Sequence, residues 1–364
     1  MKRLIIICLI VSLFLSGCSW MNGEYVSVSP HQLGYSSSNE NMPIISNYAE
    51  LRSALTTLID SGNSSGLFVG ADYSSDRLEA DTELAVSYAS NHYPIGAFAV
   101  DSIDYEFGTS GGQPMLAVDI TYRRSAAEIA NIRTVRGISG ATSAIAEALN
   151  NCEDSLILQI TGYSSTDFVQ LIADYAADNP NLVMELPQVA TQLYPNQGNV
   201  RVLELQFSYR TSRESLRFMQ NQVRPVFSSA ALYVSSEAED YTRFVQLHTF
   251  LMERFDYTLE TSITPAYSLL CHGVGDSRAF AQVYASMCRR SGLDCVSVSG
   301  TYNGESRFWN IIRIDGIYYH LDLLQCAQSG AFEVSADDEM SGYVWDYSAY
   351  PPCGEAAGNT EPSE

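Results

Sequence analysis

The chain has 364 residues, of which 46% are hydrophobic and 11% aromatic, which is enough apolar material to fill two or three domain cores and excludes global disorder. It carries 42 acidic against 20 basic residues, a formal net charge of -22. Contact with phosphates needs a positive surface, so this composition argues against a nucleic-acid partner. Lys2 is the only lysine.

Residues 1–17 have the pattern of a bacterial export signal. Two basic residues precede the apolar run of residues 4–16, which is too short to span a bilayer comfortably. The run ends in Leu-Ser-Gly-Cys, which resembles the lipobox of bacterial lipoproteins. The resemblance implies cleavage before Cys18, lipidation of its thiol, and anchoring on the extracytoplasmic face of the cell membrane. The alternative is an ordinary secretory signal with a chance cysteine. Residues 18–45 are rich in Ser, Asn, Gly and Pro, which predicts a flexible tether.

Six cysteines remain in the mature part, and five of them lie between residues 271 and 353. Export makes disulfides permissible, so we expect one or two local bridges in the last domain, although sequence does not give their connectivity. No Cys-x-x-Cys or His-x-x-x-His pair occurs. The sequence therefore gives little support for a zinc site, and we expect no cofactor.

The middle of the chain shows an internal repeat, which we place at residues 46–136 and 137–226. Each copy has a helix, a short apolar strand, a second helix and a pair of alternating strands, which predicts an α-β-α-β-β unit used twice. The copies share a Tyr-Ser-Ser segment and a Tyr-Arg pair at the end of the last strand, at residues 122–123 and 209–210. These Tyr-Arg pairs either bind a ligand or hold strand ends, and the second interpretation is favoured. The overall fold class is therefore α+β.

The last domain, residues 236–353, has a different order of elements. An amphipathic helix is expected at 236–254, and a Gly-Asp pair precedes a helix from Ser277 to about Arg290. Three strands follow, over residues 295–300, 308–314 and 317–322. Asn-Gly and Asp-Gly turns separate them. The remaining residues 354–364 are polar, and a disordered tail is expected there.

This order resembles the transglutaminase-like domain, a papain-related cysteine enzyme core. In that family a nucleophilic cysteine opens the helix, a histidine precedes Trp-Asn on a strand, and an aspartate ends the next strand. A helix N-terminus lowers the pKa of a thiol, the imidazole takes its proton, and the carboxylate orients the imidazole. The resemblance therefore implies a triad at Ser277, Arg307 and Asp322, of which only Asp322 keeps the family residue type.

The two substitutions remove the chemistry that the family uses. A serine hydroxyl is a poor nucleophile without a neighbouring base, and arginine stays protonated and cannot be that base. Arg307 either pairs with Asp322 as a structural ion pair or offers its guanidinium to an anionic ligand such as a peptide carboxylate. A displaced nucleophile is the remaining route, with Cys271 beside His272 as the alternative and His320 on the strand face of Asp322.

Aromatic residues alternate near the end of the domain at Tyr343, Trp345 and Tyr347. They either cover the sheet or contact a sugar or peptide. The sequence predicts a membrane-anchored surface lipoprotein whose transglutaminase-like domain is a pseudoenzyme that binds or scaffolds a peptide, a protein or a cell-wall glycan. The alternative is an active cell-surface amide hydrolase or acyltransferase that uses Cys271.

Overall fold

The structure is a computed structural model that describes residues 42–354, apart from the side chain of Ser110. The predicted signal peptide, the lipidation site Cys18, most of the tether and residues 355–364 of the predicted tail lie outside the described residues. Within them, no helix combines the length and the apolar character that crossing a membrane requires.

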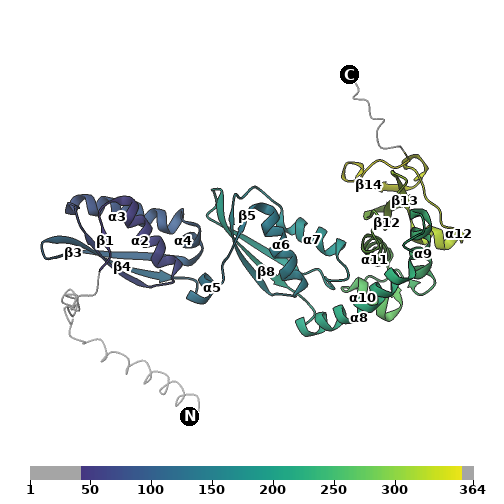
Figure 1. Cartoon of the computed structure of the whole chain (residues 1–364), viewed down its shortest axis with the longest axis horizontal. Helices are drawn as coiled ribbons and strands as arrows, with labels where there is room; N and C mark the ends of the chain where they lie inside the picture. The colour runs from purple at the N-terminus through teal and green to yellow at the C-terminus, as the bar shows by residue number, and fades with distance from the viewer. Residues whose placement is uncertain (1–41, 355–364) are drawn as a thin grey trace, which may run out of the picture. The chain divides into compact units, whose positions relative to one another are not determined.

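The first part of the described chain is a four-stranded sheet in the order β1-β2-β4-β3, in which β1 is parallel to β2 and the other pairs are antiparallel. Two helices, α2 and α3, pack on one face of this sheet through a continuous apolar core (Figure 1). The elements are β1 (Ile44–Ile45), α2 (Tyr48–Asp60), β2 (Ser65–Gly70), α3 (Ser75–Asn91), α4 (Pro94–Ala99), β3 (Val100–Ser110) and β4 (Gln113–Tyr122).

The second part is another four-stranded sheet with the same connectivity, in the order β5-β6-β8-β7. Its first pair is again parallel and the others are antiparallel, and α6 and α7 share its apolar core. The elements are α5 (Ala126–Ala130), β5 (Arg133–Arg136), α6 (Gly137–Asn150), β6 (Ser155–Thr161), α7 (Phe168–Asp178), β7 (Gln188–Tyr194) and β8 (Val200–Ser208).

Both sheets begin one strand earlier than the predicted α-β-α-β-β unit. Ile44 and Ile45 pair with β2, and Ile45 is buried, so the tether predicted to reach residue 45 ends before this strand. Residues 133–136 pair with β6, although the prediction assigned them to the first repeat. Each unit is therefore β-α-β-α-β-β. Such short edge strands carry too few residues for a recognisable period of alternation.

The Tyr-Arg pair of the first unit holds the backbone, as favoured from the sequence. The Arg123 guanidinium donates hydrogen bonds to the carbonyl oxygens of Phe98 and Ala97, and the Tyr122 hydroxyl donates to the carbonyl of Asn63 at 2.9 Å. Their polar atoms are therefore committed to tying the end of β4 to neighbouring segments.

The C-terminal domain combines a helical layer with an antiparallel sheet in the order β13-β12-β11-β14. The α+β class and the three strands predicted from residue 295 onward are confirmed. Its elements are α8 (Arg213–Tyr233), α9 (Asp240–Met252), β9 (Asp256–Tyr257), α10 (Pro265–His272), β10 (Val274–Gly275), α11 (Ser277–Arg290), β11 (Cys295–Tyr302), β12 (Glu305–Ile314), β13 (Ile317–Leu321), α12 (Leu323–Ser329), η1 (Asp337–Glu339), β14 (Tyr343–Trp345) and η2 (Tyr347–Ala349).

Helix α8 crosses the boundary that the sequence placed at residue 226. It runs through Pro225, and its buried residues Leu216, Val223, Phe227 and Ala230 share a core with α9, α10 and α11. An internal proline removes one backbone hydrogen bond and usually marks a helix end. Tertiary packing outweighs that cost here, so α8 continues and packs with the C-terminal helices.

The expected disulfides are absent from the described residues. All six cysteines there are free thiols, of which Cys271 is exposed and the others are buried. Proximity in sequence does not place two Cβ atoms at bridging geometry, and free cysteine packs readily as a small apolar side chain.

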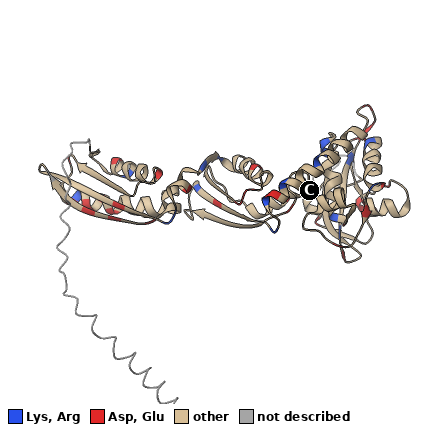
Figure 2. Ribbon diagram, turned by 90° about the horizontal axis from the view of Figure 1, so that it is seen from below, with Lys and Arg blue, Asp and Glu red and all other residues tan. Residues whose placement is uncertain are grey.

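Figure 2 shows acidic and basic residues interspersed in all three sheet-containing parts.

Candidate functional site

Ser277 opens the buried helix α11, as the sequence predicted. The Asp276 carboxylate caps the helix by accepting a hydrogen bond from the Ala279 amide at 2.8 Å. Gly275 precedes them because a Cβ there would meet the side chains of Ala279 and Leu269 at 3.0–3.1 Å. The Ser277 hydroxyl oxygen accepts a hydrogen bond from the Phe308 amide at 3.2 Å, so it lies against the backbone of the residue that follows Arg307.

Arg307 and Asp322 form a bidentate ion pair beside Ser277. Arg307 Nε donates to Asp322 Oδ2 at 2.8 Å, and Nη2 donates to Oδ1 at 2.9 Å. The side chains are only 11% and 6% exposed, so the pair is largely removed from water. Arg307 lies opposite Gly300 in the β11–β12 ladder. A Cβ at position 300 would lie 2.3 Å from the Val344 carbonyl oxygen, so only glycine fits there.

The Asp322 carboxylate has further donors besides Arg307. Its Oδ2 accepts from the Tyr343 hydroxyl at 2.8 Å, and its Oδ1 accepts from the amides of Leu324 and Gln325 at 3.0 and 3.3 Å as it caps α12. Burial and the neighbouring Asp322 charge raise the pKa of Tyr343 well above its usual range. Burial lowers the pKa of Arg307, but the hydrogen bonds and charge of Asp322 outweigh it and raise the pKa overall.

An aromatic cluster covers the end of the sheet beside this pair. Tyr343 and Trp345 pack edge-on against the fully buried Trp309, with ring centroids 5.1 and 5.8 Å apart. Tyr347 lies beyond β14, is 61% exposed, and packs on Trp345 with ring centroids 4.1 Å apart. Tyr343 and Trp345 therefore cover the sheet, whereas Tyr347 presents aromatic surface to solvent.

Cys271 lies in the last turn of α10. Partial burial raises the pKa of its thiol. The neighbouring His272 packs against the Tyr267 ring with centroids 5.0 Å apart, and no described side chain hydrogen-bonds to the Cys271 thiol. The negative end of a helix dipole also disfavours a thiolate. Cys271 thus lacks the features that activate a cysteine.

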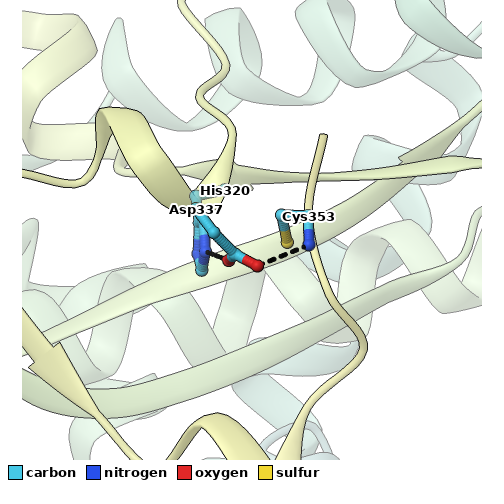
Figure 3. A group of neighbouring side chains, drawn as sticks. All are labelled: His320, Asp337 and Cys353. Carbon is cyan, nitrogen blue, oxygen red and sulfur yellow. Dashed lines mark hydrogen bonds and ion pairs between the residues drawn. The ribbon is translucent and has the colours of Figure 1, made fainter. Parts of the chain in front are cut away.

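His320 is held by a hydrogen bond at each ring nitrogen. The Trp309 indole N–H donates to Nδ1 at 2.9 Å. Nε2 lies 2.8 Å from the Asp337 carboxylate, which also accepts from the Cys353 amide at 3.0 Å (Figure 3). Because an indole only donates, Nδ1 is the acceptor and Nε2 carries the proton. Both ring nitrogens of His320 therefore already have hydrogen-bond partners.

The candidate ligand atoms of His320, Asp337 and Cys353 all lie within 4.8 Å of one another, an arrangement that resembles a metal site. A histidine that binds metal through Nε2 needs a proton on Nδ1 and an acceptor facing it. Here the Trp309 donor faces Nδ1, so the imidazole has no free lone pair. Burial and the Asp337 charge also raise the pKa of Cys353 to about 12, which disfavours the thiolate. The cluster does not suit a metal ion.

A cavity of about 210 Å³ lies beside Asp322. The residues that line it include Tyr302 and Tyr343, whose ring centroids are 4.5 Å apart, and the acidic residues Glu333 and Glu339. Aromatic and acidic residues therefore surround the cavity beside the Arg307–Asp322 pair.

Comparison with a family model gives the class of the C-terminal domain. Residues 229–336 match the family model of the transglutaminase-like superfamily, so the chain contains a transglutaminase-like domain. No curated protein matches the chain.

Three solved structures have low similarity to this chain. A crystal structure of a TGase has 12% identity and a TM-score of 0.28, and the match spans 58% of this chain and 61% of that one. A candidate cysteine protease from Cytophaga hutchinsonii has 10% identity and a TM-score of 0.26, over 43% and 70% of the chains. A candidate protease from Parabacteroides distasonis has 7% identity and a TM-score of 0.23, over 60% and 35%.

The structure brings the three predicted positions to one place and adds residues that the sequence did not assign to it. The Tyr343 hydroxyl on Asp322 was visible only as part of an aromatic run, and the Trp309–His320–Asp337 chain gave no sequence signal. Such contacts depend on how β12, β13 and β14 pair.

We predict that removing one partner of the buried ion pair destabilises the protein strongly. Arg307→Met leaves the Asp322 charge buried without its cation, which typically costs about 3–5 kcal/mol of unfolding free energy in urea titrations. Adding Asp322→Asn to this variant should recover part of the loss, because the uncompensated charge is then removed.

The matched control is the ion pair of Arg133 and Glu147, whose side chains are 50% and 57% exposed. Arg133→Met should cost less than about 1 kcal/mol. An Arg307→Met variant as stable as Arg133→Met would contradict a structural role for the buried pair.

A second prediction concerns the pH dependence of stability. Burial lowers the pKa of His320 below its usual value, although the charge of Asp337 opposes the shift. As pH falls below about 6.5, the unfolded imidazole binds a proton more readily than the folded one. The contribution of neutral His320 to the unfolding free energy is therefore complete above about pH 6.5 and is lost as pH falls. His320→Gln should reduce the loss of unfolding free energy that urea titrations measure between about pH 8 and 5. The control His92→Gln, at an exposed histidine, should leave that loss as in the wild type. Equal losses in the wild type and in His320→Gln would refute the role of His320 in the pH dependence.

Proposed function

We propose that this chain is a membrane-anchored surface lipoprotein whose transglutaminase-like domain does not catalyse acyl transfer and instead binds or scaffolds a peptide, a protein or a cell-wall glycan. The observation that carries the proposal is the fork of two hydrogen bonds from Arg307 to Asp322, at the position where the family pattern has a histidine.

Acyl transfer by this domain type needs a group that takes the proton of the nucleophile. Arg307 is cationic and holds no lone pair for a proton, and Asp322 is already bonded to Arg307, Tyr343 and the start of α12. The Ser277 hydroxyl faces a backbone donor rather than a base. Loss of acid–base assistance alone typically lowers rates by about 10²–10⁴-fold, and a hydroxyl without a base is a poor nucleophile.

The alternative, an active hydrolase or acyltransferase that uses Cys271, has less support. Its thiol has a raised pKa and no imidazole partner among residues 42–354. His320 offers no help to any nucleophile, because both ring nitrogens are engaged.

For ligand binding, the cavity beside Asp322 and the exposed ring of Tyr347 are the features that support the proposal. Aromatic faces next to hydrogen-bond acceptors suit both sugar rings and extended peptides. Lipidation at Cys18, inferred from the lipobox resemblance, would present this domain at the outer side of the cell membrane.

We expect no covalent chemistry at the triad positions. Purified protein incubated with a glutamine-donor peptide and hydroxylamine should give neither hydroxamate nor an acyl adduct by mass spectrometry. The double variant Ser277→Cys with Arg307→His restores the family residue types, and its new thiol should react with iodoacetamide at neutral pH faster than Cys271.

Adduct formation by the wild-type protein would refute the proposal. If it disappears with Ser277→Ala, the serine is a nucleophile; if it disappears with Cys271→Ser, the displaced mechanism is correct.

The anchoring has its own prediction. In a bacterial host, Cys18→Ser should move the protein from the membrane fraction, and from the detergent phase of a Triton X-114 partition, to the aqueous phase. Cys271→Ser, which keeps the lipobox, should partition as the wild type. Retention of Cys18→Ser in the detergent phase would exclude lipidation at this residue as the anchor.

A further inference from the structure

An apolar groove lies on the surface of the C-terminal domain between α8 and α9, with a volume of about 670 Å³. Both helices contribute to its walls, which include Val226, Ser229, Leu232, Tyr233, Phe250 and Arg254. The groove shares no residue with the cavity beside Asp322.

Two apolar side chains at the rim of this groove are exposed. Leu232 is 87% exposed and Tyr233 is 42% exposed, although the opposite side of α8 is buried through Phe227 and Ala230. Exposed apolar surface gathered in a groove, rather than scattered, typically marks a contact surface. This end of α8 therefore presents apolar area that the described residues do not cover.

Arg254 places a positive charge in this apolar groove. Its guanidinium lies over the rings of Phe250 and Tyr233, at 4.4 and 5.3 Å from their centroids. Nη1 donates to the Phe250 carbonyl at 3.0 Å, and no acidic side chain of residues 42–354 forms an ion pair with Arg254. In a chain with a net charge of -22, this cation is fixed in place without a carboxylate partner.

We propose that this groove docks an amphipathic peptide segment of another protein, whose apolar side chains lie along α8 and whose carboxylate pairs with Arg254. A trough between two helices is the geometry in which a third helix packs its apolar face. Because its guanidinium is stacked on two rings, Arg254 is already positioned to pair with a carboxylate, so its charge selects an acidic segment.

A fatty acid suits this groove less well than a peptide. Leu232 is almost fully exposed at the rim, so much of the acyl chain would remain in contact with water.

The test is a selection of random displayed peptides of about 16 residues on the purified full-length protein, followed by affinity measurement of the enriched peptides. We expect them to combine helically spaced apolar residues with an Asp or Glu. Leu232→Ser and Arg254→Gln should each weaken binding about tenfold or more. Leu84→Ser, at a 61% exposed leucine of α3 outside the groove, should leave binding unchanged.

Charge exchange gives the sharper readout. A selection repeated on Arg254→Glu should enrich Lys- or Arg-containing peptides in place of acidic ones. Because Leu232 is 87% exposed, Leu232→Ser should fold as the wild type, which its melting temperature will check.

The proposal is overturned if no peptide is enriched, if enriched peptides are neutral or basic on the wild type, or if they bind Leu232→Ser as tightly. Binding of cis-parinaric acid or of phosphatidylglycerol vesicles that is lost in Leu232→Ser, without peptide binding, would assign the groove to lipid instead. All of these readouts are independent of whether the Ser277 site is active or inactive.

Discussion

The carboxylate of Asp322 connects more elements of the C-terminal domain than any other described polar group of the site. It follows β13, caps α12, takes two hydrogen bonds from Arg307 on β12 and accepts the Tyr343 hydroxyl of β14. Burying a charge this deeply is costly unless each oxygen is satisfied. The fork of Arg307 meets that requirement, and the positions of β12, β14 and α12 around the cleft depend on it.

The same pair sets the chemical character of the cleft. In the arrangement that this domain resembles, a carboxylate orients an imidazole that exchanges protons with a nucleophile. Here the carboxylate is matched to a guanidinium, a cation of fixed charge that has no lone pair with which to accept a proton. Ser277 keeps the position of a nucleophile at a capped helix start, but its hydroxyl is aligned on the Phe308 amide.

The sequence was most informative where local signals are strong. Helix α11 begins at Ser277 and ends at Arg290 as predicted, because Asp276 caps one end and Gly292 follows the other with a positive φ of 77°. The resemblance placed Arg307 and Asp322 together, and the ion pair was one of its two open alternatives.

Features set by tertiary packing were less predictable. The first strand of each four-stranded sheet is too short to show an alternating pattern in the sequence. A proline usually marks a helix end, so Pro225 gave no indication that α8 continues past it. The clustered cysteines suggested disulfide bridges, but the described residues contain none. Spacing along the chain carries no information on side-chain geometry, so the sequence could not show this. The bonds that hold His320 join β12, β13 and η1, so no stretch of sequence contains them.

The aromatic cluster has a practical consequence for spectroscopy. Trp309 and Trp345 are both buried and pack edge-on against each other, and they are the tryptophans of the described chain, since Trp20 lies outside it. The two N-terminal sheets contain tyrosine but no tryptophan within residues 42–208. In a Trp20→Phe variant, selective excitation of indole would therefore isolate the melting of the C-terminal domain from that of its neighbours, without any added label.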